Sequence, residues 1–261
     1  MNRPRFDIIG AAAFGFQSVF TERRYLSGIA LVPICIVTAI ELGKIFALDK
    51  QSLITELVSL IPVSMAGAWF MFLQTRLLVF GERTPETYIA APEERRRAFE
   101  ACAILWTLTQ VGALGLVGYM LFWQQQISAE AASAPLNVIG YLLIGASFWA
   151  LRFSIAHILG ATGYSIRDYI FRVNGAMVSL RLLALMMVVM FPIALMAMPV
   201  EEALIATAKS EDPAPLNIIG LSLLRVIFNF ILLAVFNAAA VFALRQMLGK
   251  GKGKPRMGIS V

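Results

Sequence analysis

The sequence predicts an all-α fold: a polytopic transmembrane helical bundle of about six spans, with interfacial helices at the N-terminus and on the cytoplasmic side. Two observations predict it. Apolar residues make up 59% of the 261 residues, and the mean hydropathy is +0.77, whereas about half of the residues in a soluble domain are apolar. The apolar residues also gather in runs of about 20 or more, the length that a helix needs to cross about 30 Å of hydrocarbon.

Six such runs follow one another along the chain. The expected spans cover residues 25–47, 53–80, 99–123, 137–160, 176–199 and 217–247. Together they form one transmembrane domain, residues 25–247, because the segments between them are too short for a separate soluble domain. A segment of residues 1–24 precedes this domain, and a basic cytoplasmic tail of residues 248–261 follows it. The alternative, a soluble helical core, requires a polar face on most helices, which these runs lack.

The N-terminal segment carries its apolar residues at helical spacing. One face of the expected helix holds Phe6, Ile9, Ala13, Phe16 and Phe20. Such a pattern predicts an amphipathic helix that lies along the membrane before the first span. The alternative is a lead-in helix that packs under the bundle. A signal peptide is not expected, because the apolar residues are spaced and the charged sequence TERR follows them.

Basic residues lie almost entirely on one side of the expected topology. The opposite set of connections holds only Lys50 and Lys209. Because cytoplasmic loops carry an excess of arginine and lysine, both termini are expected in the cytoplasm. This asymmetry accounts for the net charge of +6. Nucleic acid is not an expected partner, because the basic tail has neither aromatic interleaving nor a recognisable binding fold.

A seven-residue repeat precedes two of the runs. The sequence reads APLNVIG at residues 134–140 and APLNIIG at residues 214–220. Proline favours extended backbone before it, and Asn137 or Asn217 can cap the first free amides of a helix. The repeat therefore predicts two equivalent helices that enter the membrane from outside. Duplicated helical hairpins occur in transporters, and they also build scaffolds without transport activity.

Charged residues in the outer parts of the spans form a first candidate cluster. Glu41 and Lys44 lie near the end of the first span, Glu56 lies near the start of the second, and Arg225 lies at a similar depth in the sixth. Charges at membrane depth need partners. We expect a structural ion-pair cluster in which Glu41 contacts Arg225 and Lys44 contacts Glu56. The alternative is the polar wall of an outward-facing cavity.

Three arginines form a second candidate cluster toward the cytoplasm. Arg76, Arg152 and Arg181 lie in the inner parts of the second, fourth and fifth spans, which hold no acidic residue at matching depth. They predict a basic inner vestibule that contacts an anionic lipid headgroup or another anionic ligand. The alternative is that the three side chains extend separately to the lipid phosphates.

The third span has a helix start signal outside the membrane. Pro92 suits the first helical position, and Glu93 and Glu94 suit the first turn. A helix over residues 92–123 would extend about 48 Å, well beyond the hydrocarbon. We expect this stalk to present a surface to a protein partner through Arg95, Arg96 and Arg97. The alternative is that these arginines form a solvated collar that faces the lipid phosphates.

A second cytoplasmic segment, YSIRDYIFRVN at residues 164–174, combines a capping signal with apolar residues. Ser165 and Asp168 have the spacing of a capping box. Tyr169, Ile170 and Val173 give the segment an apolar face. We expect a short helix at the inner membrane interface.

The stretch QTRLLVFGER, residues 74–83, with Trp69 before it, resembles a group of bacterial six-span inner-membrane proteins of unassigned activity. Some of that group are similar to the membrane domain attached to glycerophosphodiester phosphodiesterases. The likeness covers the first two spans best, and this chain has Gln74, Thr75 and Arg76 where the group often has Trp-His-Arg. The resemblance implies a helical bundle in the bacterial inner (plasma) membrane, and it transfers no catalytic residue.

Motifs for catalysis are not visible. The only histidine, His157, lies near the inner end of the fourth span without an acid placed to orient it. Cys35 and Cys102 lack the spacing of metal ligands or of a disulfide framework. No zinc motif, phosphate-binding loop or nucleotide fingerprint is present. We therefore expect neither enzymatic activity nor a metal or other cofactor.

The sequence leaves two kinds of function open. We expect a non-enzymatic membrane scaffold or accessory subunit that contacts membrane lipids, with a protein partner on the cytoplasmic side, and an oligomer is compatible with it. The alternative is a small transporter or channel for a small anionic or lipid-like solute. An essential polar residue near the midplane, such as Gln110, Asn229 or Asn237, would favour transport.

Overall fold

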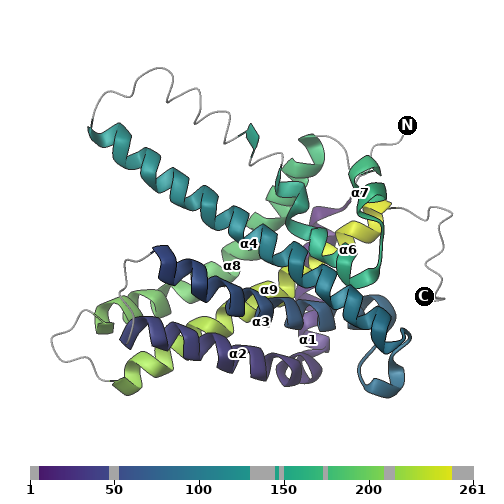
Figure 1. Cartoon of the computed structure of the whole chain (residues 1–261), viewed down its shortest axis with the longest axis horizontal. Coiled ribbons are helices and arrows are strands. Elements are labelled where there is room, and N and C mark those ends of the chain that lie inside the picture. The colour runs from purple at the N-terminus through teal and green to yellow at the C-terminus, as the bar shows by residue number, and fades with distance from the viewer. Residues whose placement is uncertain are drawn as a thin grey trace.

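The computed structural model describes residues 6–46, 53–129, 145–146, 150–172, 176–208 and 215–248. In these ranges all of the regular structure is helical, which confirms the all-α prediction. The helices are α1 (Ile8–Thr21), α2 (Arg23–Phe46), α3 (Leu53–Phe80), η1 (Pro85–Thr87), α4 (Pro92–Ala129), η2 (Leu151–Ile155), α6 (Ala156–Thr162), α7 (Ile166–Arg172), α8 (Ala176–Ala208) and α9 (Pro215–Leu248) (Figure 1).

Four of the described helices are long and apolar enough to cross a membrane. They are α2, the Val58–Phe80 part of α3, the Ala176–Thr207 part of α8, and α9. These helices correspond to the first, second, fifth and sixth expected spans. Residues 137–144 and 147–149 of the expected fourth span, and the side chains of the expected third span beyond residue 112, lie outside the described part of the chain.

The inner end of the expected fourth span differs from a continuous α-helix. Residues 151–162 form the 3₁₀ turn η2 followed by the short helix α6. Gly163 ends α6 with φ of +72°, a backbone conformation that glycine adopts without a steric penalty. The inner end of the expected span is therefore helical but is not one regular α-helix, because the backbone tightens before α6 begins.

Close packing on α4 holds the short helix α6. A Cβ atom on Gly160 would lie 2.6 Å from the backbone nitrogen of Cys102. The two helices therefore approach at a point where only glycine fits. Both Cys102 and the α6 residues around Gly160 are buried, so α6 is an internal element.

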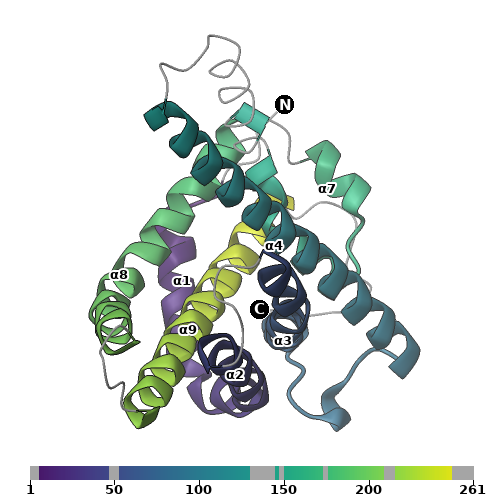
Figure 2. The same ribbon diagram turned by 60° about the vertical axis from the view of Figure 1, so that its left-hand side comes forward.

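Helix α9 is the centre of the bundle. Both larger apolar clusters include α9 residues; one joins α9 to α1, α6 and α8, and the other joins it to α2, α3 and α4. Figure 2 shows α9 with α1 and α8 on one side and α2 and α3 on the other. Small residues let the neighbouring helices approach closely, and the buried alanines of α9 are Ala234, Ala238, Ala239, Ala240 and Ala243.

Helix α1 packs with one face and exposes the other. Its Ala11 and Gly15 are buried, and a Cβ on Gly15 would lie 2.6 Å from the carbonyl oxygen of Val235 in α9. Of the predicted apolar face, Ile9 is 77% exposed and Phe20 is 70% exposed. Helix α1 is therefore packed against the bundle, as the alternative held, and it also presents apolar side chains outward.

Helix α8 exposes apolar side chains along most of its length. The exposed fractions are 64% for Met187, 67% for Phe191 and 65% for Met196. Exposed apolar surface on this scale is costly in water and favourable against lipid tails. The four candidate spans and this surface together indicate a membrane protein.

The start of α4 confirms the capping prediction, and the helix is longer than expected. It begins at Pro92, with Glu93 and Glu94 in its first turn. It continues to Ala129 rather than ending near residue 123, which makes it 38 residues long. At 1.5 Å per residue, α4 extends about 57 Å.

The start of α9 differs from its prediction. The helix begins at Pro215, so Asn217 lies inside the first turn and does not cap it. Proline suits this position because it has no N–H group to leave unsatisfied. The first copy of the repeat, residues 134–140, lies outside the described residues.

Candidate functional site

The site begins where α3 ends. Helix α3 stops at Phe80, and Gly81 follows with φ of +71° while its amide donates to the carbonyl of Leu77. This left-handed residue reverses the chain at the helix C-terminus. The next residue, Glu82, therefore turns back toward α3, and it is only 1% exposed.

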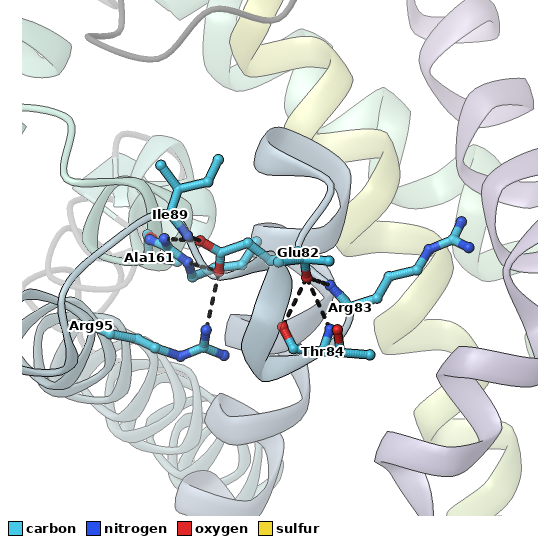
Figure 3. Close-up of polar contacts among 8 residues, drawn as sticks. Glu82, Arg83, Thr84, Ile89, Arg95 and Ala161 are labelled. Carbon is cyan, nitrogen blue, oxygen red and sulfur yellow. Dashed lines mark hydrogen bonds and ion pairs between the residues drawn. The ribbon is translucent and has the colours of Figure 1, made fainter.

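Glu82 contacts α3, α4 and the loop between them, and its partner Arg76 also reaches α6 (Figure 3). Arg76 Nε donates to Glu82 Oε2 at 2.6 Å, and Arg76 Nη2 donates to Oε1. Arg95 Nη1, from α4, lies 3.2 Å from Oε2. The amide of Ile89 donates to Oε1 at 3.1 Å, and Arg76 Nη1 donates to the carbonyl of Ala161 in α6 at 3.3 Å. We call these five residues the Glu82 clamp.

The electrostatics of the clamp favour an ionised Glu82. Burial alone raises the pKa of a carboxyl group. The hydrogen bonds from Arg76 and from the Ile89 amide, together with the charges of Arg76 and Arg95, outweigh that effect and lower the pKa of Glu82. Glu82 is therefore a carboxylate at neutral pH.

Aromatic rings surround the two guanidinium groups. The Arg95 guanidinium lies 3.1 Å from the centroid of the Tyr88 ring, and that of Arg76 lies 4.6 Å from the centroid of Phe80. Both also lie within 6 Å of Phe72. Cation–π contacts of this kind stabilise the cations where water is excluded.

A second buried group of polar residues lies next to the clamp. Gln74 and Thr75 of α3, His157 of α6 and Asn237 of α9 are each at most 1% exposed. Asn237 Nδ2 donates to Gln74 Oε1 at 3.0 Å and to Thr75 Oγ1 at 3.1 Å, and Asn237 Oδ1 lies 3.0 Å from His157 Nε2. The Trp106 ring of α4 meets the imidazole edge to face at 5.2 Å. We call Gln74, Thr75, His157 and Asn237 the polar network.

Two arginines of the predicted vestibule, Arg76 and Arg181, have separate side-chain partners. Arg76 belongs to the Glu82 clamp, so its charge is compensated within the chain. Arg181 Nη1 donates to the carbonyl of Phe6 at 3.2 Å. Arg152 is 6% exposed, and its carbonyl accepts a hydrogen bond from the Tyr169 hydroxyl. The expectation that Arg76 lacks an acid holds only within its span, because Glu82 follows the span directly.

Three of the four residues of the predicted ion-pair cluster, at the other end of the spans, have described side chains. Arg225 Nη1 lies 3.7 Å from Glu41 Oε2, as predicted, and Lys44 Nζ lies 3.4 Å from Glu41 Oε1. Glu201 of α8 was not anticipated: its Oε1 lies 2.8 Å from Arg225 Nε, outside hydrogen-bond geometry. The side chain of Glu56 is outside the described residues, so its pairing with Lys44 stays a prediction.

The three arginines of the stalk divide between the inside and the surface. Arg95 is turned inward to Glu82. Arg96 and Arg97 are exposed and lie near Glu100 and Glu93, at 3.6 Å and 3.8 Å, one turn along the helix. Only Arg96 and Arg97 are therefore available to a partner. In the segment after α6, Ser165 Oγ accepts the Asp168 amide at 3.3 Å, as its capping spacing predicted.

A hollow opens where α1 meets α2. It has a volume of about 420 Å³ and is lined by Thr21, Glu22, Arg23, Arg24, Tyr25 and Arg83. Arg83 Nη2 lies 2.6 Å from Glu22 Oε1, and Arg23 Nη1 donates to the carbonyl of Phe20 at 3.0 Å. Arg24 has no ion-pair partner among the described residues. Three cations therefore face one anion in what we call the α1–α2 hollow.

The described residues offer no site for a metal, because no three histidine, cysteine, aspartate or glutamate side chains lie close enough to hold one. The clamp has one carboxylate, that of Glu82, which is already paired with Arg76 and Arg95. The polar network has amide, hydroxyl and imidazole groups that hydrogen-bond one another, and an imidazole can exchange a proton.

Sequence reasoning missed Glu82, Glu201 and the α1–α2 hollow. A signal for Glu82 was present in the stretch FGER: a glycine directly after an apolar run and then a carboxylate can return the chain to an arginine one or two turns back. Glu201 carried no such signal, because its contact with Arg225 depends on how α8 packs against α9.

The residues that carry the family resemblance also build the site. Gln74, Thr75, Arg76, Gly81 and Glu82 all lie in the stretch 74–83. The resemblance itself stays a prediction. The chain matches no family model, no curated protein and no solved structure.

Proposed function

We propose that this protein is a non-enzymatic scaffold or accessory subunit of a bacterial inner membrane, and that its cytoplasmic side contacts anionic lipid headgroups. The proposal includes six spans with both termini in the cytoplasm. The α1–α2 hollow is the observation that carries the lipid contact, because three arginines there face one glutamate. Arginine binds phosphate oxygens through paired N–H groups, which suits a lipid phosphate.

The position of the hollow fits headgroup depth. It lies at the first residues of α2, and the apolar part of this candidate span follows at once. The neighbouring apolar side chain of Phe20 is 70% exposed, and Leu31, two to three turns into α2, is 63% exposed. A lipid could therefore place its phosphate against the arginines and its tails along α2.

The charge distribution supports the orientation. Arg23, Arg83 and Arg245 lie at the ends of α2, α3 and α9 that meet one another, as the bond from Arg245 Nη2 to the Leu78 carbonyl at 2.8 Å indicates. At the opposite ends, the cluster around Glu41 and Arg225 holds equal numbers of acids and bases. The arginine-rich ends are the cytoplasmic ends by the positive-inside rule.

Lipid binding can be measured on the intact protein in mild detergent by native mass spectrometry. We expect phosphatidylglycerol to form more adducts than phosphatidylcholine, and Arg24→Gln with Arg83→Gln to remove the difference. Arg97→Gln is the matched control, since Arg97 is an exposed arginine outside the hollow. Equal adducts for both lipids in the wild type contradict the proposal. Binding of inorganic phosphate without lipid preference would assign the hollow to a free anion.

The polar network favours a second candidate function, a small transporter. Polar side chains buried among membrane helices are costly and commonly line a solute or ion pathway. Purification from the native membrane followed by mass spectrometry separates the two functions. A stoichiometric protein partner supports the accessory subunit, with Arg96 and Arg97 as the surface to change. A bound solute that Asn237→Leu removes supports transport.

A further inference from the structure

A chain of hydrogen bonds runs through the polar network from one backbone carbonyl to another. At one end, Gln74 Nε2 donates to the carbonyl oxygen of Ala234 at 2.8 Å. Asn237 Nδ2 donates to Gln74 Oε1 at 3.0 Å, and Asn237 Oδ1 lies 3.0 Å from His157 Nε2. At the other end, His157 Nδ1 lies 3.2 Å from the carbonyl oxygen of Ser154. The chain therefore begins and ends on an acceptor.

The backbone decides how both amides are oriented. A carbonyl oxygen only accepts, so Gln74 turns its NH₂ group to Ala234 and its oxygen to Asn237. Asn237 then turns its NH₂ group to Gln74, on the side where the carbonyl of Met71 also lies, at 3.4 Å. This orientation leaves the Asn237 oxygen facing His157.

Both ring nitrogens of His157 therefore face oxygen acceptors. A neutral imidazole has one N–H group and one lone pair, so it satisfies only one of the two. An imidazolium has two N–H groups and satisfies both. Flipping Gln74 or Asn237 does not help, because each amide has one donor side and one acceptor side and the mismatch only moves to another link. With a neutral His157, the hydrogen-bond chain therefore has one donor too few, and a charged His157 supplies the missing N–H group.

We propose that His157 is a proton-binding site and that the bound proton completes the hydrogen-bond chain linking α3, α6 and α9. The proposal goes beyond the lipid contact and does not depend on it. Ser154 can serve the neutral form: its buried Oγ has no hydrogen-bond partner in the described part of the chain, and its hydroxyl could donate to Nδ1 after rotation. The site then has two hydrogen-bonded forms that differ by one proton.

The surroundings of His157 oppose a permanent charge. The buried titratable and charged side chains on the elements packed around His157 are Cys102 on α4, Arg152 on η2 and Arg76 on α3, and Arg76 is paired with Glu82, which also contacts Arg95. The other charged side chains of α4 and α9 are not buried. No carboxylate contacts the ring among the described residues. Burial favours the neutral ring, since His157 is fully enclosed, whereas the chain of acceptors favours the charged one. The proton is therefore gained on acidification and lost again as the pH rises.

The chain's single histidine makes a direct measurement possible. Selective ¹⁵N-histidine labelling of the full-length protein in detergent micelles gives NMR signals from His157 alone. As the pH falls, we expect the signal of the unprotonated ring nitrogen to be lost and both nitrogens to become protonated, while circular dichroism shows the helices intact. A ring that stays neutral down to the pH of unfolding overturns the proposal.

Three variants and a control test the role of the chain. At a fixed pH within the transition, we expect the protonated fraction to rise in Asn237→Asp, which adds a carboxylate, and in Ser154→Ala, which removes the donor of the neutral form. It should fall in Asn237→Leu. Asn229→Leu is the control, since Asn229 is exposed on the same helix. Equal protonated fractions in the wild type, Asn237→Asp and Ser154→Ala overturn the proposal even if Asn237→Leu does not fold.

Discussion

Glu82 shows how one side chain can hold several helices together. It lies outside the apolar run of α3, yet it is buried and receives donors from α3, α4 and the connecting loop. A buried ion pair contributes little compared with an apolar contact of the same size. The loss of one partner is costly, because it leaves the other charge buried and unpaired.

Replacing Glu82 by glutamine should therefore destabilise the bundle. We expect Glu82→Gln to lower the free energy of unfolding by about 3 kcal/mol, at the low end for a broken buried pair, since the amide oxygen still accepts from Ile89. Thermal unfolding in detergent, followed by circular dichroism, measures the change. Glu86→Gln in the same loop is the control, because Glu86 is exposed. An equal melting temperature for both variants would mean that the clamp does not stabilise the fold.

The pH dependence of stability follows from the same group. The pKa of Glu82 is lowered below its ordinary value of 4.5 in the folded protein, so the folded state binds the proton less readily than the unfolded chain. The stabilisation is complete above pH 4.5 and is lost as the pH falls through the lowered value. Melting temperatures recorded from pH 6 downward should fall less steeply below pH 4.5 in Glu82→Gln than in the wild type. Parallel curves would contradict this assignment.

The sequence predicts some of these contacts and not others for a physical reason. Glu41 and Arg225 could be paired because depth along a membrane helix follows from counting residues from its end. Partners such as Glu82 and Arg95 meet through a loop reversal, and Glu201 meets Arg225 through helix rotation. Counting residues along the chain gives the depth of a residue, but it gives neither the rotation of a helix nor the path of a loop.

At the scale of elements, α6 depends on a glycine contact. The Cβ of an alanine at position 160 would lie 2.6 Å from the backbone nitrogen of Cys102 and 2.7 Å from the carbonyl carbon of Ala101. Backbone atoms cannot rotate away as a side chain can, so α4 and α6 would have to separate.

We expect Gly160→Ala to destabilise the protein by about 1–3 kcal/mol, the usual cost of overpacking. Gly112→Ala, also in a helix of this bundle, is the control because nothing lies within 4 Å of its added Cβ; it should be neutral or stabilising, since alanine favours helix. Chemical denaturation in mixed micelles compares the two. If both variants unfold at the same denaturant concentration, the contact between α4 and α6 is looser than the structure shows.

Helix starts were more predictable than helix continuity. Pro92 with Glu93 and Glu94 marked the start of α4 correctly, because these residues act within one turn. The break between η2 and α6 was not anticipated, since apolar composition is the same in a 3₁₀ turn and an α-helix. The start at Pro215 rather than Asn217 is an error of two residues of the kind that capping rules allow.

At the scale of the whole molecule, composition predicted the helical class and the apolar spans. Four of the expected spans correspond to helices that are long and apolar enough to cross a membrane. The packing order around α9 could not be predicted, because lipid-facing and buried faces are both apolar. The six-span topology stays a prediction.

Cysteine labelling in intact cells tests that topology. With Cys35 and Cys102 replaced by alanine, we expect single cysteines at positions 130 and 210 to react with an impermeant reagent, because the positive-inside rule places both outside. A cysteine in place of Thr84 should react only after the cells are opened. Protection of position 130 or 210 in intact cells, or labelling of position 84 in intact cells, would contradict the proposed orientation or the proposed number of spans.

The exposed face of α8 sets a condition on the lipid around it. Met177 and Met198 are both more than half exposed and lie about 32 Å apart along the helix axis at 1.5 Å per residue, which matches a hydrocarbon thickness of about 30 Å. Glu201 and the exposed Glu202 follow at once, so the apolar face ends there. Because α8 is packed on α9, it cannot tilt to fit a thinner bilayer without the bundle. The protein should therefore lose stability in thin bilayers.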